Sequence, residues 1–267
     1  MRTKTLLPLF LISVMAPASM LWGQNTYVPD DNFEQALIDL GYDDTLDDYV
    51  VTANISGLTS LAVGDKDIVD LTGIEAFTSL TSLDCGFNDL TSLDVSSITG
   101  LTYLDFASNQ LTSIDLSNNT SLEYLYAQNN QLTSMDLGNL SSLHTIMYNY
   151  NQLPSMDLSA NTGLIKIECT DNGITSMDVS NFTALEELTC YQNELTSLDL
   201  SSNPALKVLS CFTNQLIHLN MKNGVTDALT FYATGNSFDC IEVNADDIAY
   251  ATANWTSANG NIDAGVG

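Results

Sequence analysis

Carboxylates are the groups in this 267-residue chain whose type and even spacing could do chemistry. Rows of carboxylate oxygens are ligands that Ca²⁺ prefers, and paired carboxylates can hydrolyse glycosidic bonds. Recurrence at one fixed position instead favours a structural role, in which Ser hydroxyls and backbone N–H groups hydrogen-bond each carboxylate. A line of weak calcium sites remains the alternative. The recurring residues are Asp94, Asp115, Asp136, Asp157, Asp178 and Asp199.

The chain has two histidines, His144 and His218, a residue type that often acts in catalysis. Neither has a serine, cysteine or carboxylate at a spacing that suggests a triad, and we expect both at the surface. The sequence also contains no glycine-rich phosphate loop and no His-Glu-x-x-His motif. It therefore predicts that the protein is not an enzyme, with no catalytic residues and no cofactor.

A 21-residue period is the strongest signal in the chain. The frame that begins at Leu80 restarts at Leu101, Leu122, Leu143, Leu164, Leu185 and Leu206. Positions one, four, six, eleven, fourteen and sixteen of each copy are apolar, so one coil buries little alone but stacked coils form a continuous core. The alternation at positions three to seven predicts a strand, and successive strands would pair in parallel about 4.8 Å apart.

Position nine of each copy is asparagine, whose amide can satisfy backbone groups where the chain leaves the strand. The pattern L-x-x-L-x-[apolar]-x-x-N-x-L resembles the leucine-rich repeat of secreted bacterial internalin-like proteins. The resemblance spans residues 58–243, about nine copies, and implies an α/β, β-rich, curved right-handed solenoid with parallel strands on its concave face and short helical caps. The asparagines of this structural ladder are Asn88, Asn109, Asn130, Asn151, Asn172, Asn193 and Asn214.

Four of the five cysteines occupy position six, an inward-facing position. Side chains in register on parallel strands point the same way, whereas a disulfide needs converging Cβ vectors. Zinc needs four ligands around a point rather than along a line. We therefore expect free, buried thiols at Cys85, Cys169, Cys190 and Cys211, and the pairing of Cys240 stays open.

Residues 1–23 are predicted to be a secretory signal peptide, because Arg2 and Lys4 precede an apolar run and small residues. Cleavage after Ala18 and near Gly23 both remain open. The protein is therefore expected to be secreted or displayed at the cell surface. No attachment domain is recognised, and whether the chain is a complete protein stays open.

Residues 24–57 and 244–267 are expected to cap the two ends of the solenoid, since repeat arrays need atypical terminal units. The first cap should contain a helix that starts near Asp30 and stops at Gly41. Its predicted apolar face is Phe33, Ala36, Leu37 and Leu40. In the second cap, the residues expected to cover the last coil are Ile248, Ala251 and Trp255.

The chain has 33 acidic residues against 6 basic ones, for a net charge of −27. Without the leader it keeps four lysines and no arginine. Such a polyanion cannot neutralise phosphates, which excludes nucleic acid as a partner. We expect no insertion into a membrane, and a monomer.

Positions three, five, seven and eight should project outward from the sheet, and they vary between copies while the framework repeats. Six of the eleven tyrosines fall there. Tyr favours strands in general, but exposed Tyr on a rigid scaffold is typical of recognition surfaces. The sequence predicts protein–protein recognition or adhesion on the concave face; carbohydrate binding by the same aromatic residues is the alternative. The predicted ligand-binding residues are Phe87, Tyr103, Asp105, Tyr124, Tyr126, Tyr150, Lys166, Glu168, Glu187, Tyr191, Phe212 and Tyr232.

Overall fold

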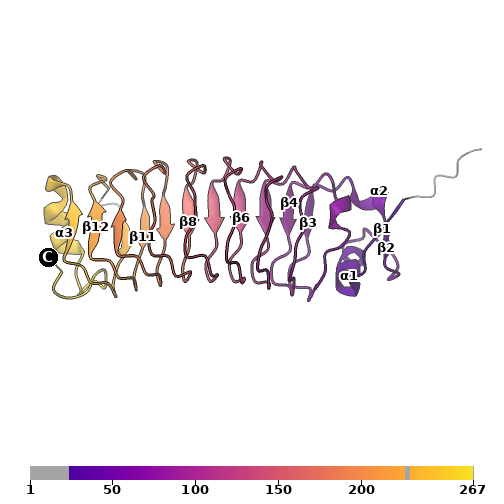
Figure 1. The fold of residues 1–267 in the computed structure, drawn as a ribbon, viewed down its shortest axis with the longest axis horizontal. Helices are drawn as coiled ribbons and strands as arrows, with labels where there is room; N and C mark the ends of the chain where they lie inside the picture. The colour runs from indigo at the N-terminus through magenta and orange to yellow at the C-terminus, as the bar shows by residue number, and fades with distance from the viewer. Residues whose placement is uncertain (1–23, 226–228, 267) are drawn as a thin grey trace, which may run out of the picture.

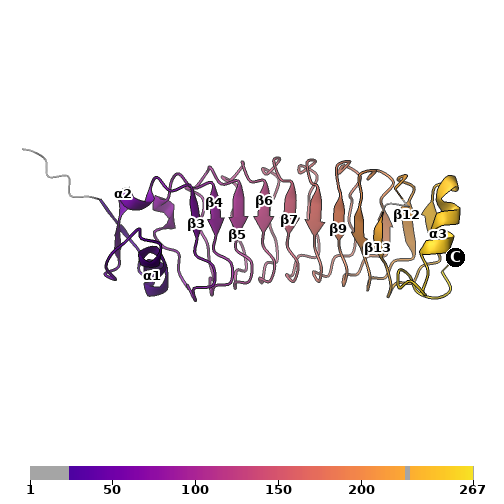
Figure 2. The same cartoon turned by 180° about the vertical axis from the view of Figure 1, so that it is seen from behind.

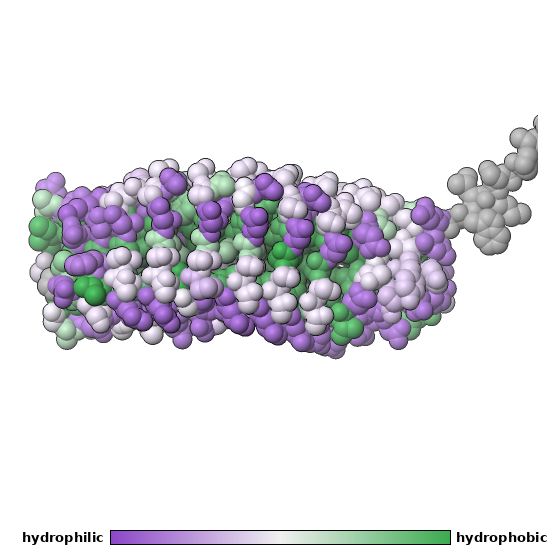
Figure 3. All heavy atoms as spheres, in the orientation of Figure 1, coloured by the Kyte–Doolittle hydropathy of each residue, from purple (hydrophilic) through white to green (hydrophobic). Residues whose placement is uncertain are grey.

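The computed structural model describes residues 24–225 and 229–266, which form one long stack of coils with a helical unit at each end (Figures 1 and 2). The predicted signal peptide at residues 1–23 lies outside the described residues. The stack follows the chain from one end to the other, so each coil contacts chiefly the coil before and the coil after it. Hydrophilic and hydrophobic residues form rows along the length of the stack (Figure 3).

Nine short parallel strands form the main sheet, one from each coil, in the order β13-β11-β9-β8-β7-β6-β5-β4-β3. Each step of the register is one repeat, as where Leu104 pairs with Leu125. The central residue of each strand is buried, and the residues on either side of it point outward. This arrangement confirms the predicted parallel solenoid. The strands are β3 (Ser60–Ala62), β4 (Ser82–Asp84), β5 (Tyr103–Asp105), β6 (Tyr124–Tyr126), β7 (Thr145–Met147), β8 (Lys166–Glu168), β9 (Glu187–Thr189), β11 (Val208–Ser210) and β13 (Thr230–Tyr232).

A second, three-stranded parallel sheet forms toward the C-terminal end, from a later part of the same coils. Its order is β10-β12-β14. The strands are β10 (Ser197–Asp199), β12 (His218–Met221) and β14 (Cys240–Val243).

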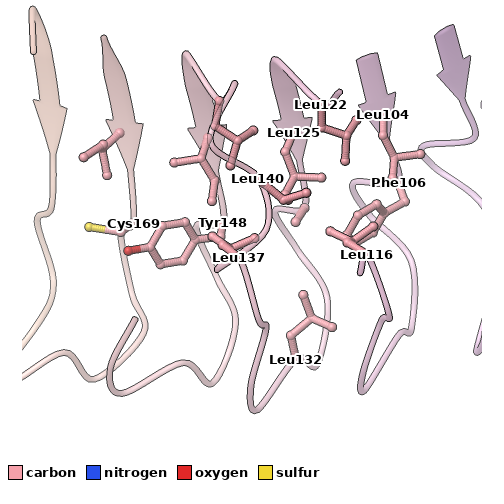
Figure 4. Packing of buried hydrophobic residues seen from close by; sticks show 14 of the residues in the cluster. Leu104, Phe106, Leu116, Leu122, Leu125, Leu132, Leu137, Leu140, Tyr148 and Cys169 are labelled. Carbon is pink, nitrogen blue, oxygen red and sulfur yellow. The ribbon is translucent and has the colours of Figure 1, made fainter. Parts of the chain in front are cut away.

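The core is a continuous column of leucines and position-six side chains (Figure 4). Tyr148 is fully buried at position six, and its hydroxyl is directed toward Cys169 in the next coil. The four position-six cysteines are buried and free, as predicted, and Cys240 is free and half-buried. Burial raises the pKa of each of the four buried thiols, that of Cys211 to about 12.

The N-terminal cap joins an antiparallel pair, β1 (Asn25–Tyr27) and β2 (Tyr49–Val51), to helix α1 (Asp31–Asp39) and short helix α2 (Thr52–Ile55). A 3₁₀ turn, η1 (Ile74–Ala76), follows in the next coil. The α1 cap residue is Asp30, as expected. One oxygen of its carboxylate accepts from Asn32 N and Phe33 N, both at 2.9 Å, and the other accepts from Val69 N and Asp70 N, again at 2.9 Å. Asp30 therefore starts the helix and also ties the cap to the stack.

Phe33, Ala36 and Leu37 are buried in the cap, as predicted, but Leu40 is 45% exposed. The prediction for Leu40 was wrong because α1 ends at Asp39, and Leu40 already belongs to the turn that leaves the helix.

The C-terminal cap consists of a 3₁₀ turn, η3 (Ala245–Asp247), and helix α3 (Ile248–Asn254). Trp255 is 5% exposed and packs on Phe231 of the last coil with ring centroids 4.5 Å apart, and Ala251 packs against the core. Ile248 was wrongly expected to cover this coil. It is 55% exposed, because α3 rests on the stack through its C-terminal end and leaves Ile248 at the rim of an open groove.

Candidate functional site

The outward face of the nine-stranded sheet, hereafter the sheet face, carries every side chain that the sequence singled out for binding. Each lies at or next to a strand whose central residue anchors it to the core. Four are exposed, namely Phe87, Tyr124, Tyr150 and Tyr232. The other eight are half-buried: Tyr103, Asp105, Tyr126, Lys166, Glu168, Glu187, Tyr191 and Phe212.

Three tyrosines from β5 and β6 form a first aromatic cluster. The ring of Tyr103 lies 6.5 Å from that of Tyr124 and 5.3 Å from that of Tyr126, with tilted planes in both pairs. Such separations fall within the favourable range for aromatic pairs. The rings therefore support one another and need little further ordering to bind a partner.

A second aromatic cluster lies further along the stack. Tyr191 and Phe212, from adjacent coils, are stacked with centroids 4.2 Å apart and planes 10° from parallel. The hydroxyl of Tyr150 lies 3.4 Å from that of Tyr191. The structure therefore brings together three of the predicted aromatic residues that come from three different coils.

A polar network lies beyond the first aromatic cluster, in coils that it partly shares with the second. Lys166 Nζ lies 2.8 Å from Glu168 Oε1 and 3.1 Å from Glu187 Oε1. Asn149 donates its amide to Glu168 Oε2 at 2.9 Å and accepts from Thr170 N at 2.7 Å. Burial alone would lower the pKa of Lys166, but the two carboxylates outweigh it and raise that pKa. Lys166 therefore stays protonated, and the two carboxylates balance its positive charge.

Position eight of each coil has a left-handed backbone, although in most coils it is not glycine. Phe87 has φ of 54° and Tyr150 has φ of 56°, and smaller residues in other coils share this conformation. The conformation aims the backbone N–H at the next coil, as where Phe87 N donates to Ala107 O at 2.8 Å. A bulky side chain there costs roughly 1 kcal/mol. Phe87 and Tyr150 therefore adopt a backbone conformation that is unfavourable for bulky side chains.

The sequence reasoning did not single out Asp84, although it lies at position five, which was predicted to face outward. Asp84 pairs in register with Asp105 on the neighbouring strand, and both side chains are half-buried. Burial, followed by the charge of Asp84, raises the pKa of Asp105. Burial and the same two carboxylates raise the pKa of Tyr103 to about 12.

The asparagine ladder at position nine satisfies the backbone, as predicted. Asn130 is representative: its amide donates to Phe106 O of the preceding coil at 3.0 Å and to Ala127 O of its own coil at 3.3 Å. Its carbonyl accepts from Leu111 N at 3.0 Å. Each such residue therefore fastens two coils together.

A second asparagine ladder was missed. Asn119, Asn161 and Asn203 lie at position nineteen of every second coil and are fully buried. The amide of Asn119 donates to Val95 O and Ile98 O of the preceding coil, both at 3.0 Å, while its carbonyl oxygen has no hydrogen-bond partner. The signal was present in the sequence, because the coils between them carry an apolar residue at position nineteen: Ile98, Leu140 and Phe182.

The aspartate row at position fifteen is hydrogen-bonded in the way the sequence indicated. Asp94 Oδ1 accepts from Ser96 N at 2.9 Å, and the equivalent bond recurs in the following coils, with Gly138 N as the donor to Asp136. Hydrogen bonds from the following serine lower the pKa of Asp94, Asp115, Asp157, Asp178 and Asp199. Across residues 24–225 and 229–266, no three His, Cys, Asp or Glu side chains gather as a metal site would require.

The two histidines lie apart from this face's aromatic clusters, in separate coils. His218 is exposed, as predicted. His144 is half-buried, and its Nδ1 is enclosed without a hydrogen-bond partner. The expectation of a surface position is therefore only partly met for His144.

Comparison with known proteins agrees with this geometry. The family model described as leucine-rich repeats (2 copies) matches residues 99–140. Internalin J of Listeria monocytogenes serotype 4b is 38% identical over 72 residues, which are 27% of this chain and 8% of that protein. The chain is similar to internalin-like leucine-rich-repeat proteins.

Solved structures extend the similarity to most of the chain. The functional domain of InlJ from Listeria monocytogenes, described as including a cysteine ladder, is 33% identical with a TM-score of 0.75, over 82% of this chain and 52% of that one. Internalin C2 from the same species, at 19% identity and a TM-score of 0.63 over 83% of this chain and 98% of that one, shares the fold. The chain thus spans about half of the InlJ domain and a small part of internalin J.

Proposed function

We propose that this protein is an exported, noncatalytic recognition module that binds a protein partner through the aromatic residues of its sheet face. Leucine-rich-repeat proteins of the internalin-like type generally mediate protein–protein interaction. The observation that supports this face is the contrast between its side chains and the framework. Residues that hold the coils together recur every 21 positions, whereas those on the sheet face do not.

The chemistry of the sheet face suits recognition. Tyr and Phe bury a large area on binding and lose little side-chain entropy, so they are frequent anchors of protein interfaces. Between and beside the two aromatic clusters, Lys166 is paired with Glu168 and Glu187, so its own charge needs no partner from outside. We further propose that the curvature of the stack makes this face concave.

Glycan binding on the same surface is the second candidate. It is favoured by the parallel stack of Tyr191 on Phe212 and by the exposed ring of Tyr232, which offer flat apolar faces. Neutral oligosaccharides added in excess should displace the natural ligand if it is a glycan and leave it bound if it is a protein.

The decisive experiment is capture of surface components by the exported form of the chain, followed by triple substitution of Tyr124, Tyr126 and Tyr150 with alanine. Capture should be abolished while the circular dichroism spectrum is retained. A matched variant replaces three exposed tyrosines outside the sheet face, Tyr27, Tyr49 and Tyr250. Undiminished capture by the first variant, or equal loss in both, would contradict the assignment.

Export is proposed from the leader at residues 1–23. Within the described part of the chain, no helix has the length and apolar character needed to cross a bilayer. Sequencing the N-terminus of the protein recovered outside the cell should find Gln24, or a residue a few positions earlier, as the new first residue. We also propose that the exported chain is monomeric.

A further inference from the structure

We propose that Asp84, Asp105 and the tyrosine rings beside them bind an arginine side chain from a basic segment of the partner protein. This inference rests on the proposed function, because it names the chemistry of the partner at one place on the sheet face. It starts from two like charges that face each other on β4 and β5.

The two carboxylates have no cation of their own. Among the described residues, the lysines that form ion pairs are Lys166, Lys207 and Lys222, and all of them pair with glutamates further along the stack. Like charges placed directly opposite on neighbouring strands destabilise a sheet. Partial burial and, after it, the charge of Asp84 raise the pKa of Asp105. A bound cation would relieve both.

Backbone N–H groups donate hydrogen bonds to one oxygen, Oδ1, of each of the two carboxylates. Asp84 Oδ1 accepts from Gly86 N at 3.1 Å, and Asp105 Oδ1 accepts from Ala107 N at 2.9 Å. These bonds fix the orientation of both groups. The hydroxyl of Tyr103 also hydrogen-bonds the carboxylate of Asp105, whereas Asp84 keeps an oxygen for a ligand.

Glycine keeps the space next to the pair free of side chains. A Cβ added to Gly64 would lie 3.2 Å from Asp84 Oδ1, and one added to Gly86 would lie 3.1 Å from Asp105 Oδ1. Later coils carry side chains at this position, including Asn149, Tyr191 and Phe212. The acidic pair therefore lies in the part of the sheet face where position seven is smallest.

Aromatic rings complete the site and select among cations. Tyr126 follows Asp105 in the same row of the sheet, and Tyr103 lies 5.3 Å from Tyr126 between centroids. A guanidinium group is planar, can bridge two carboxylates with parallel hydrogen bonds, and stacks on aromatic faces. An ammonium group would satisfy the charge but not this geometry. The charge of −27 on the whole chain would also draw a basic segment toward the surface.

The test is a titration of the exported chain with a blocked Gly-Arg-Gly-Arg-Gly peptide, followed by chemical-shift changes at the amides of β4 and β5. The same peptide with citrulline, which keeps the shape but lacks the charge, should not bind. The double variant D84N/D105N keeps hydrogen-bond acceptors and should bind the arginine peptide about tenfold or more weakly, since a hydrogen bond to a charged group contributes at least that much. The matched control D94N/D115N removes the same charge from the aspartate row and should bind normally.

Three outcomes would overturn the inference: no binding of the arginine peptide to the unmodified chain, equal weakening in both double variants, or reproduction of the shift changes by calcium chloride alone. The proposed function is judged separately, by capture of a protein partner and its loss in the triple tyrosine variant. If capture is lost there but persists in D84N/D105N, the recognition face stands and the arginine site is wrong.

Discussion

The hydroxyl of Tyr150 lies 3.4 Å from the hydroxyl of Tyr191, although 41 residues of chain and one complete coil separate them. The contact raises the pKa of Tyr150, chiefly through the hydrogen bond to Tyr191. Side chains from coils that are not adjacent therefore meet across the coil between them. A partner therefore meets a surface whose spacing the stack has already set.

The left-handed backbone at Tyr150 yields a prediction about stability. Tyr150→Gly should be about 1 kcal/mol more stable than Tyr150→Ala in urea denaturation, because glycine adopts positive φ without a steric penalty. Tyr124 is the matched control, since it lies in strand β6 with an extended backbone. There the glycine variant should be the less stable of the two. If the glycine and alanine variants rank in the same order of stability at both positions, Tyr150 is not under backbone strain.

Asn130 provides a prediction about the ladder at position nine. Asn130→Ala should lower the free energy of unfolding by about 3 kcal/mol, because it leaves buried carbonyl and N–H groups of two coils without partners. The nearby Asn118 is exposed and makes one long contact, 3.3 Å, to Ser96 O. Asn118→Ala should change the free energy of unfolding by no more than about 0.5 kcal/mol. Equal losses would mean that the ladder is not what joins the coils.

Asp105 gives a prediction about pH. Its pKa is raised in the folded protein, so its ionisation costs stability, and the cost grows as the pH rises through the folded pKa. Asp105→Asn should therefore be more stable than the unmodified chain at pH 7, with a gain that vanishes below the unfolded pKa, at about pH 4.

The control for this pH effect is Asp115, whose pKa is lowered by its hydrogen bonds from Ser117. Its ionised form contributes stability that is present above the unfolded pKa and is lost as the pH falls through the folded pKa. Asp115→Asn should therefore show no gain at pH 7. Urea denaturation of both variants at pH 7 and pH 4 measures the difference, and a gain of equal size in both would refute the local explanation.

Removal of divalent metal should leave the melting temperature of the exported chain unchanged, because backbone N–H groups bond the carboxylates of the aspartate row. The check is differential scanning calorimetry with and without a chelator. A drop of several degrees that calcium restores would establish the calcium sites that remain the alternative interpretation.

The repeating part of the fold could be predicted from the sequence because every coil solves the same packing problem. A leucine at position four or an asparagine at position nine has the same neighbours in each coil, so its position in the repeat predicts its contacts. At the ends this logic fails. Leu40 and Ile248 look apolar and periodic, yet each lies at a helix terminus where no coil covers it.

The candidate site was only partly predictable. Position in the repeat indicated which side chains face outward, but not which of them meet. The stack of Tyr191 on Phe212 and the ion pairs of Lys166 depend on rotamers and on the offset between coils. Asp84 could not be singled out from its own position in the repeat, because its importance depends on its pairing with Asp105 on the neighbouring strand.

Asparagine and apolar side chains alternate at position nineteen, so successive layers of the stack are not interchangeable. Deletion of a single coil would bring two asparagine layers, or two apolar layers, into contact. Deletion of two neighbouring coils would keep the alternation of asparagine and apolar layers. Deletion or duplication of coils should consequently be tolerated in even numbers, so that the array shortens or lengthens by pairs of coils rather than by single repeats.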